Sequence, residues 1–449
     1  MDSDFLLRDA LARQLFNVVK GFPIIDWHNH LSIKDLSLDR QFGDLTELWI
    51  ASDPYKHRAM RICGVPEKYI TGSVPNFKKY EAWSWTLPQL VGNPLYDWSR
   101  LELHRIFGIE EDLTPATAEK IWRQANEQLS NPEFSACGLL KRFNVEYAAP
   151  CTQLGEPLQP FASLKSIVPS LRGDDILALT HPLFTEVRDL SELHSRLENE
   201  IGKLHAAGCR FADHALDNGF QYVQDDGKNG QRFEKFIQGH LPEKERCALS
   251  CYMLRFLASQ YAKLGWTVQL HVGAQRKTSS RLRSQTGTAG GYASIGNSCN
   301  LSSLTSLLDD LECSDAGLPR VIFYTLNPTD HAMFAVLSGS FPGDGERGKV
   351  TLGPAWWYCD HIHGMKDCFE NIAAYGVLSV FPGMTTDSRS LLSFVRHEYF
   401  RRVFCAWLAE KAAREEIPSD YSILKDIAEK VCYFNAKAMI NQPKGEKWK

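Results

Sequence analysis

Several features that mark whole classes of protein are missing from this sequence. No run approaches the roughly 18 apolar residues that a membrane-spanning helix needs. The stretch from Met1 to Asp9 is polar and acidic and lacks the apolar segment of a secretory signal, so we expect no signal peptide. A Gly-rich dinucleotide fingerprint is also missing, which leaves a doubly wound nucleotide-binding sheet without support.

Neither sign of charge is in excess, and the cysteines form no pattern. The formal net charge is -4 and the pI is near 6.4. This balance predicts neither nucleic acid nor a membrane as partner. The 12 cysteines are scattered, and the closest pair, Cys247 and Cys251, lies in a helical pattern and not in a metal-binding knuckle. We therefore expect free thiols in a reducing cytoplasm.

What the chain does have is length and apolar content. Its 449 residues, 44% of them hydrophobic, suffice for a large core, and a single domain of this length suggests an α/β barrel. Residues 4–20 predict an amphipathic helix. Residues 34–136 show helical patterns but no convincing strand, and one predicted helix has Thr114 as N-cap and Pro115 as first residue.

Strand-like apolar runs alternate with helical patterns along the rest of the chain. Eight such units predict one (β/α)8 TIM barrel domain over residues 1–449, with residues 34–136 as a helical insertion after the first strand. A doubly wound open sheet is the alternative. The predicted strands are Ile24 to His30, Val145 to Pro150, Ile167 to Arg172, Cys209 to His214, Thr267 to Gly273, Val321 to Leu326, Lys349 to Trp357 and Leu378 to Met384.

The first predicted strand carries a His-x-His pair. Side chains two apart on a strand share a face, so Asp26, His28 and His30 should lie on one face, and Trp27 and Asn29 on the other. Two imidazoles on one rigid strand are well placed to bind a metal ion. Alone, the pair is a weak signal and is better explained as two polar residues at a strand end. Its position ahead of a long α/β pattern favours the metal site.

A barrel gathers its chemistry at the C-terminal ends of its strands. Asp387 follows the eighth predicted strand, which closes beside the first, so its carboxylate should reach an ion held by His28 and His30. As a lone residue it would instead be read as the N-cap of the amphipathic helix predicted over Leu391 to Lys411. Other polar residues at strand ends or on the polar face of the fifth strand are Arg172, His214, Thr267, Gln269 and His271.

These residues belong to blocks that resemble the uronate isomerases of the amidohydrolase superfamily. The blocks follow that family's order and span nearly the whole chain. They are Asp26 to Ser32, Ser52 to Arg61, Gly92 to Leu95, Leu101 to Leu103, Gly208 to His214, Gln269 to Ala274, Leu326 to Pro328, Trp356 to Trp357, Gly383 to Ser390 and Arg396 to Arg402.

The resemblance implies a metal-dependent aldose–ketose isomerase of small sugar acids, active on pairs such as D-glucuronate and D-fructuronate or D-galacturonate and D-tagaturonate. A divalent ion, zinc in this interpretation, would be held by His28, His30 and Asp387, with His214 or His271 as a further ligand or a substrate contact. Asp387, or a group beside it, is the candidate base for the C2 proton. By resemblance, Tyr55 is the candidate proton shuttle during ring opening.

The substrate carboxylate calls for a planar, permanently charged partner, and Arg389 and Arg172 are the candidates. The alternative for Arg389 is a solvated first-turn residue, and for Arg172 a bridge between rim carboxylates is an equally good interpretation. We expect Trp356 and Trp357 to form core and pocket wall, with sugar stacking possible for one of them. His361 and His363 repeat the His-x-His spacing, but in a loop-like stretch, and are taken as surface residues.

Three departures from the family pattern fall near the expected site. Cys151 to Pro157 replaces a segment that usually carries paired aspartates, Arg172 is followed by Gly173 and Asp174 where Pro-Asp is usual, and His57 stands where Trp is common. The missing aspartates keep open the hypothesis of an inactive homologue that binds a sugar acid. A second alternative is a metal-dependent hydrolase, because the superfamily that the chain resembles is mostly hydrolytic. Any assembly is expected to be a symmetric homo-oligomer.

Overall fold

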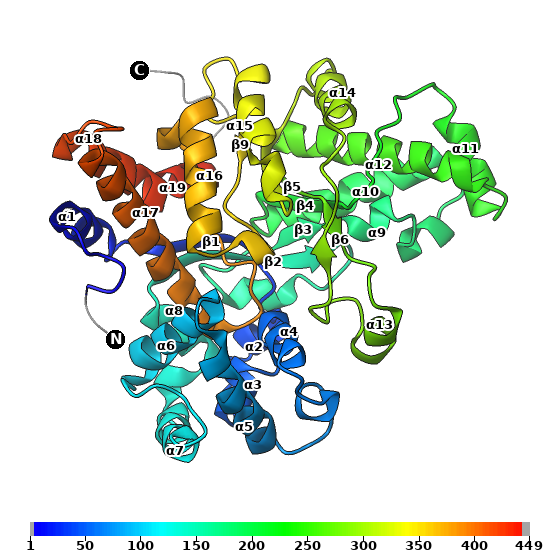
Figure 1. Cartoon of the computed structure of the whole chain (residues 1–449). Coiled ribbons are helices and arrows are strands. Elements are labelled where there is room, and N and C mark those ends of the chain that lie inside the picture. The colour runs from blue at the N-terminus through cyan, green and yellow to red at the C-terminus, as the bar shows by residue number, and fades with distance from the viewer. Residues whose placement is uncertain (1–3, 442–449) are drawn as a thin grey trace.

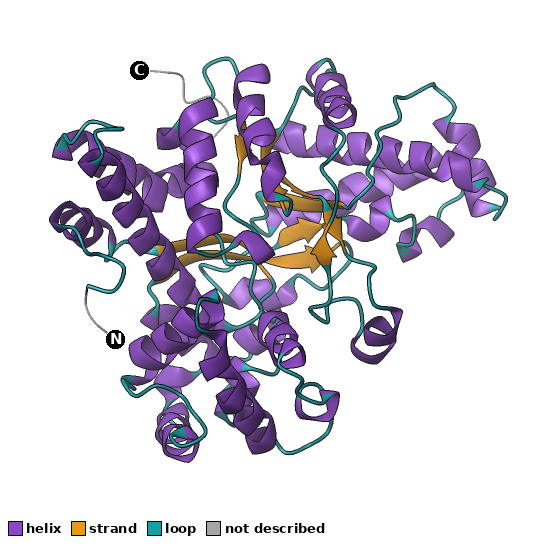
Figure 2. Ribbon diagram, viewed as in Figure 1, coloured by secondary structure: helices purple, strands orange, loops and turns teal. Residues whose placement is uncertain are grey.

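The computed structural model describes residues 4–441, in which a curled parallel sheet is wrapped by helices (Figures 1 and 2). The strand order is β1-β2-β3-β4-β5-β8-β9, so neighbours in the sheet are also successive along the chain, apart from a small hairpin. All pairings in this sheet are parallel. The strands are β1 (Ile24–Asn29), β2 (Val145–Gln153), β3 (Ser170–Arg172), β4 (Phe211–Leu216), β5 (Thr267–Val272), β8 (Arg320–Thr325) and β9 (Val350–Leu352).

Helices return the chain between most of these parallel strands, as parallel pairing requires. The crossovers bury apolar side chains against the sheet and one another, and this α/β barrel-like architecture confirms the predicted fold class. The helices concerned are α9 (Asp174–Leu177) and α10 (Leu190–Ala206), α11 (Asn229–Ile237) and α12 (Glu243–Leu264), α14 (Leu301–Glu312) and α15 (His331–Ser340), and α16 (Ile362–Tyr375) follows the last strand.

The eighth strand is where the prediction is wrong. Residues Leu378–Val380 form a 3-10 helix, and the chain to Ser390 has no regular secondary structure. Gly383 has φ +89° and Asp387 has φ +47°, conformations that an extended strand does not contain. The segment nevertheless lies along β1: the Asp387 N–H donates to the His28 carbonyl at 3.0 Å, and the His30 N–H to the Ser388 carbonyl at 2.8 Å.

The residues between β1 and β2 are helical and gather below the sheet in Figure 1, coloured blue to cyan. The helix predicted to have Thr114 as its N-cap begins three residues later, because Thr117 is the residue that precedes α7. The Thr114 hydroxyl contacts the Thr117 hydroxyl at 3.2 Å. The helices are α2 (Ile33–Ser37), α3 (Leu45–Trp49), α4 (Pro54–Ile62), α5 (Asn76–Thr86), α6 (Pro94–Phe107), α7 (Ala118–Leu129) and α8 (Ala136–Arg142).

The two ends of the described chain pack together. Helix α1 (Ala10–Val19) begins at its N-cap Asp9, later than predicted, and packs on α17 (Val395–Ala413). A 3-10 turn, Leu391–Phe394, precedes α17. Helices α18 (Tyr421–Glu429) and α19 (Asn435–Asn441) follow, joined by a π-helical turn.

Two smaller findings complete the fold. An unpredicted hairpin of β6 (Ala274–Gln275) and β7 (Ser294–Ile295) encloses α13 (Ser280–Thr286). The 12 cysteines are free thiols, as predicted. Within residues 4–441, no helix combines the length and apolar character that crossing a membrane requires.

Candidate active site

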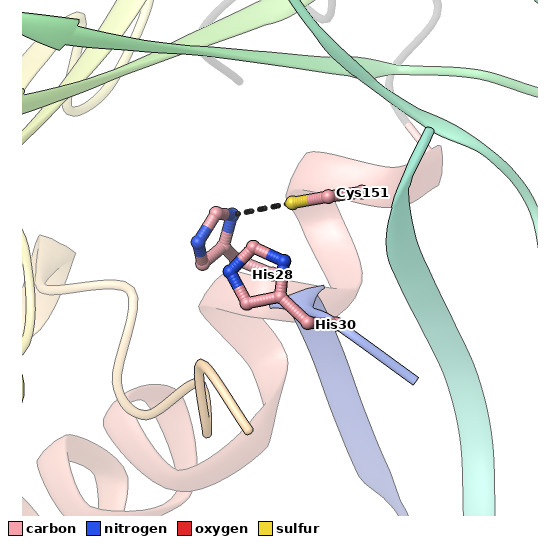
Figure 3. A group of neighbouring side chains, drawn as sticks. All are labelled: His28, His30 and Cys151. Atoms are coloured by element: carbon pink, nitrogen blue, oxygen red, sulfur yellow. Dashed lines mark hydrogen bonds between the residues drawn. The ribbon is translucent and has the colours of Figure 1, made fainter. Parts of the chain in front are cut away.

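The two histidines of β1 converge with Asp387. Asp387 Oδ1 lies 3.3 Å from His28 Nε2 and 3.0 Å from His30 Nε2. His28 is buried and His30 partly exposed. Figure 3 shows the two imidazoles side by side, with Cys151 approaching the other nitrogen of His28. As the sequence analysis expected, Asp387 lies beside the two histidines, although the segment that carries it is not a strand.

The two separations from Asp387 Oδ1 to the imidazoles suit ligands of a divalent metal ion. Donors bound about 2 Å from one tetrahedral ion lie roughly 3.3 Å apart, close to the two separations measured between Asp387 Oδ1 and the imidazoles. Imidazole nitrogen and carboxylate oxygen together are a donor set typical of zinc and similar ions.

Asp26 does not share the face of the histidines, which corrects the expectation from simple alternation. Its carboxylate accepts hydrogen bonds from the Thr386 hydroxyl at 2.6 Å and from Thr385, and it lies 3.7 Å from His397 Nε2. The register of β1 against β2 shifts between Asp26 and Asn29. This irregularity changes the phase of the alternation, so His28 reaches the cluster while Asp26 braces the segment before Asp387.

Two residues that were not proposed as ligands complete the cluster. Cys151 Sγ, on β2, lies 3.7 Å from His28 Nδ1 and 3.4 Å from Asp213 Oδ1 on β4. Within residues 4–441, two groups have donor atoms that all lie within 4.8 Å of one another, which is close enough for one ion: His28, His30 and Cys151, and His28, Asp213 and His271. Cys151 opens the stretch that departs from the family pattern, and Asp213 directly precedes the residue chosen from the sequence.

His214 lies away from this cluster. Its Nε2 is 3.2 Å from the Tyr261 hydroxyl of α12, and the two rings stack at 5.8 Å. Adjacent residues of a strand face opposite sides, so β4 points Asp213 at the cluster and His214 at the helices. His271 does belong: its ring centroid is 4.6 Å from that of His28, and its buried Nε2 has no hydrogen-bond partner within residues 4–441.

The electrostatics of the cluster are strongly coupled. Burial opposes the charged form of His28, but Cys151 and Asp387 outweigh it and raise the pKa of His28 well above its usual value. The same partners raise the pKa of His30. Burial likewise opposes ionisation of Asp387, yet its hydrogen bonds with His28 and His30 hold its pKa well below the usual range. The carboxylate is therefore ionised at neutral pH.

The indoles of Trp356 and Trp357 both donate to the second oxygen of the key carboxylate. The distances to Asp387 Oδ2 are 2.7 Å from Trp356 Nε1 and 2.6 Å from Trp357 Nε1. Trp356 is buried and Trp357 partly exposed. Their N–H groups thus contact the site itself, beyond the wall role expected from the sequence.

The two predicted carboxylate-binding arginines differ in their surroundings. Arg172 is paired with Asp174 at 2.8 Å and with Asp213 at 3.4 Å. Arg389 is exposed at the cavity and makes no ion pair within residues 4–441. Arg58, which sequence reasoning missed, also lines the cavity and donates to the Ala293 carbonyl at 3.0 Å. Its place three residues after Tyr55 on α4 was the available signal.

Tyr55 projects into the cavity from the first turn of α4. The Asp53 side chain caps that helix by accepting from the Tyr55 N–H at 2.9 Å. The Tyr55 hydroxyl has no hydrogen-bond partner within the described residues. Burial, then the nearby Asp387 charge, raises the pKa of Tyr55 well above 10, so the phenol keeps its proton at neutral pH.

His28, His30, Cys151, His271 and Asp387 line one cavity of about 890 Å³ together with Tyr55 and the two tryptophans, whereas Asp26, Asp213 and His214 are not part of its lining. It lies where the strands end, as the sequence analysis expected for a barrel. Its charged lining includes Arg58, Arg172, Arg276 and Arg389 beside the Asp387 carboxylate. His361 and His363 are not part of it: the His361 side chain instead caps α16 by accepting from the Gly364 N–H.

Comparison with known proteins gives one consistent result. The family model for glucuronate isomerase matches residues 1–440. The uronate isomerase of Geobacillus thermodenitrificans is 40% identical, covering 97% of this chain and 98% of its own length. That of Haemophilus influenzae is 38% identical over 97% of this chain and 98% of its own length.

Solved structures agree with the sequence matches. The uronate isomerase of Thermotoga maritima superposes with a TM-score of 0.91 at 30% identity, covering 98% of this chain and 99% of its own. The glucuronate isomerase of Caulobacter crescentus gives 0.88 at 21% identity, covering 99% and 98%, and supports the fold alone.

Proposed function

This chain belongs to the glucuronate isomerase family, and we propose that it interconverts an aldouronate and a ketouronate by moving a proton between C2 and C1. The substrate pairs proposed are D-glucuronate with D-fructuronate and D-galacturonate with D-tagaturonate. The observation that carries this proposal is the meeting of His28, His30 and Asp387 inside a cavity lined by arginines.

His28, His30 and Asp387 are the residues that would hold a divalent ion, which we propose to be zinc. When bound, such an ion acts as a Lewis acid toward the substrate carbonyl and the adjacent hydroxyl. Asp387 Oδ1 is the proposed base for the C2 proton, supported by the low pKa of this carboxyl, which keeps it ionised. Tyr55, whose hydroxyl keeps its proton at neutral pH, is proposed to donate a proton during ring opening.

Arg389 is the proposed anchor for the substrate carboxylate, because its guanidinium has no carboxylate partner within residues 4–441 and offers a bidentate fork. Arg172 is already paired with Asp174 and Asp213, so we assign it to the polar wall that meets substrate hydroxyls. His271 presents a free Nε2 for another hydroxyl, and Trp356 closes the wall beside it at a ring separation of 4.7 Å.

We also propose that the protein works in the cytoplasm as a symmetric homo-oligomer. Its twelve free thiols fit a reducing compartment, and most soluble oligomers are symmetric assemblies of one chain. Size-exclusion chromatography with light scattering measures the assembly directly.

The activity test uses purified protein with and without added zinc, incubated first with D-glucuronate and then with D-galacturonate. Proton NMR follows the ketouronate. We expect turnover of at least one substrate, lost in His28→Ala and retained in His363→Ala, whose exposed imidazole lies outside the cavity. Folded, metal-loaded protein that converts neither substrate would overturn the proposal.

A further inference from the structure

The carboxylate of Asp387 divides its two oxygens between different partners. Oδ1 faces the two imidazoles at 3.0 and 3.3 Å. Oδ2 accepts the N–H groups of Trp356 and Trp357 at 2.7 and 2.6 Å. Two donors at these distances occupy the lone pairs of Oδ2, so only Oδ1 is available to an ion or a substrate proton.

Two adjacent residues do not ordinarily aim their side chains at one atom, because successive residues of extended chain point to opposite sides. Here Trp356 is extended, whereas Trp357 has φ +46°. The left-handed conformation is rare for a large side chain and persists where surrounding structure enforces it. It turns the second indole onto the same oxygen, with the ring centroids 4.5 Å apart.

The two indoles also pack against the side chain of Arg276. The guanidinium of Arg276 lies 4.9 Å from the Trp357 ring centroid and 5.8 Å from that of Trp356. Arg276 is fixed in turn by Asp217, whose Oδ1 accepts from its Nε at 2.7 Å. Asp387 also has a positive φ, +47°. Trp357 and Asp387, which are joined by one of the two hydrogen bonds, thus both have rare backbone conformations. This indicates that the surrounding structure fixes the orientation of the carboxylate.

We infer that Trp356 and Trp357 are positioning residues that fix Asp387, committing Oδ2 to the indoles and presenting Oδ1 alone to the ion and the reacting carbons. The expected effect on turnover rests on the proposed function, whereas the expected effect on metal affinity does not. Without one donor, the carboxylate is free to rotate, so an ion can capture both oxygens or lose its ligand geometry.

The test substitutes Trp357→Phe and Trp356→Phe, which keep an aromatic ring and delete the N–H. Zinc affinity is measured by competition with a chromophoric chelator. Each variant should bind zinc about 10- to 100-fold more weakly, as is typical when a partner of a metal ligand is removed. kcat should fall in parallel, with KM for the uronate little changed. Trp83→Phe is the matched control, because that buried indole N–H has no partner within residues 4–441.

A second measurement reports on the two indole hydrogen bonds. In 15N-labelled protein, two of the eleven indole N–H resonances should shift between the parent and Asp387→Ala. These should be the two resonances missing from the Trp356→Phe and Trp357→Phe spectra.

Two results would overturn the inference. One is unchanged zinc affinity in both variants. The other is a raised KM with kcat and zinc affinity intact, which would make the indoles substrate contacts. The zinc and NMR measurements need no substrate, so they decide the point even if no uronate is turned over.

Discussion

Two clusters of buried polar and charged side chains in this molecule differ in whether their atoms have partners. In the helical insertion, Lys56 Nζ lies 2.6 Å from Asp53 Oδ2 and 3.6 Å from Glu102 Oε2, and Trp49 donates to Glu102. Each charge of this insertion cluster has a partner. At the cavity, Asp387 is paired, but the Tyr55 hydroxyl and His271 Nε2 have no hydrogen-bond partner within residues 4–441.

The difference separates a structural cluster from a binding one. Buried polar atoms are ordinarily hydrogen-bonded, and the insertion cluster obeys that rule from within the chain. The cavity cluster leaves donors and acceptors facing a space of about 890 Å³. Those atoms find partners only when something occupies the cavity, so changes there should alter activity more than stability, and changes in the insertion cluster should do the reverse.

The largest effect should come from Asp387→Asn. Removing the proposed base and ion ligand should lower turnover about 10³-fold, with a smaller loss of stability than a break in the insertion cluster. Asp53→Asn is the matched change, and it should give the reverse pattern. Proton NMR of the ketouronate and urea unfolding measure the two quantities. Asp387→Asn that keeps a tenth of the parent turnover would contradict the comparison.

Lys56→Met should break the insertion cluster. It leaves two buried carboxylates without their cation, which typically costs roughly 3–5 kcal/mol of unfolding free energy. Lys78→Met, at an exposed lysine paired with Glu81, should cost at most about 1 kcal/mol. Equal losses in the two urea titrations would show that the insertion charges are not a structural cluster.

Metal removal should affect the cavity cluster alone. Dialysis against a chelator should abolish turnover and lower the unfolding free energy, by about 2.7 kcal/mol relative to protein with zinc at 100 times its Kd. Adding zinc back should restore both. In Lys56→Met, added zinc should not restore the unfolding free energy that is lost when the insertion cluster is broken. Calorimetry of parent and variant, each with and without zinc, separates the two contributions; a chelated protein with full turnover would refute the metal site.

Arg389→Met should raise KM for the uronate by roughly tenfold to a hundredfold, since a charged hydrogen-bonding partner of the carboxylate is lost. Its exposed position predicts an unchanged urea midpoint. Arg389→Lys should be intermediate, because a lysine keeps the charge but not the fork. If KM is unchanged in Arg389→Met, another cation, such as Arg58, holds the carboxylate.

The smallest effect should be a pH dependence in the insertion. Burial lowers the pKa of His57 below 6.5, with Asp53 opposing that shift, whereas the pKa of His28 and of His30 is raised. The unfolded chain therefore binds a proton at His57 near pH 6.5 while the folded chain does not. The resulting stability is present above pH 6.5 and is lost as pH falls toward the folded-state pKa.

His57→Phe should flatten that part of the stability curve. Urea unfolding from pH 7.5 down to pH 5.5, on parent and variant, measures the slope. Identical slopes would show that His57 titrates alike in both states.

The order of elements was largely readable from the sequence. Seven of the eight predicted strands exist in the predicted order, because apolar runs between helical patterns are local signals. The eighth failed because Leu378–Val380 forms a 3-10 helix and Gly383 takes a positive φ angle. Nothing in the local pattern distinguishes a regular strand from a chain that pairs with its neighbour through only a few hydrogen bonds.

The sequence alone predicted that His28, His30 and Asp387 meet, because the segment before Asp387 returns along β1 whether or not it forms a regular strand. It did not determine which neighbours join them. A register shift in β1 directs Asp26 away from the histidines. The alternation of β4 points Asp213, and not His214, at the cluster. The turn at Trp357 places two indoles against Asp387. Side-chain direction depends on register and backbone conformation, which only the packing of distant elements fixes.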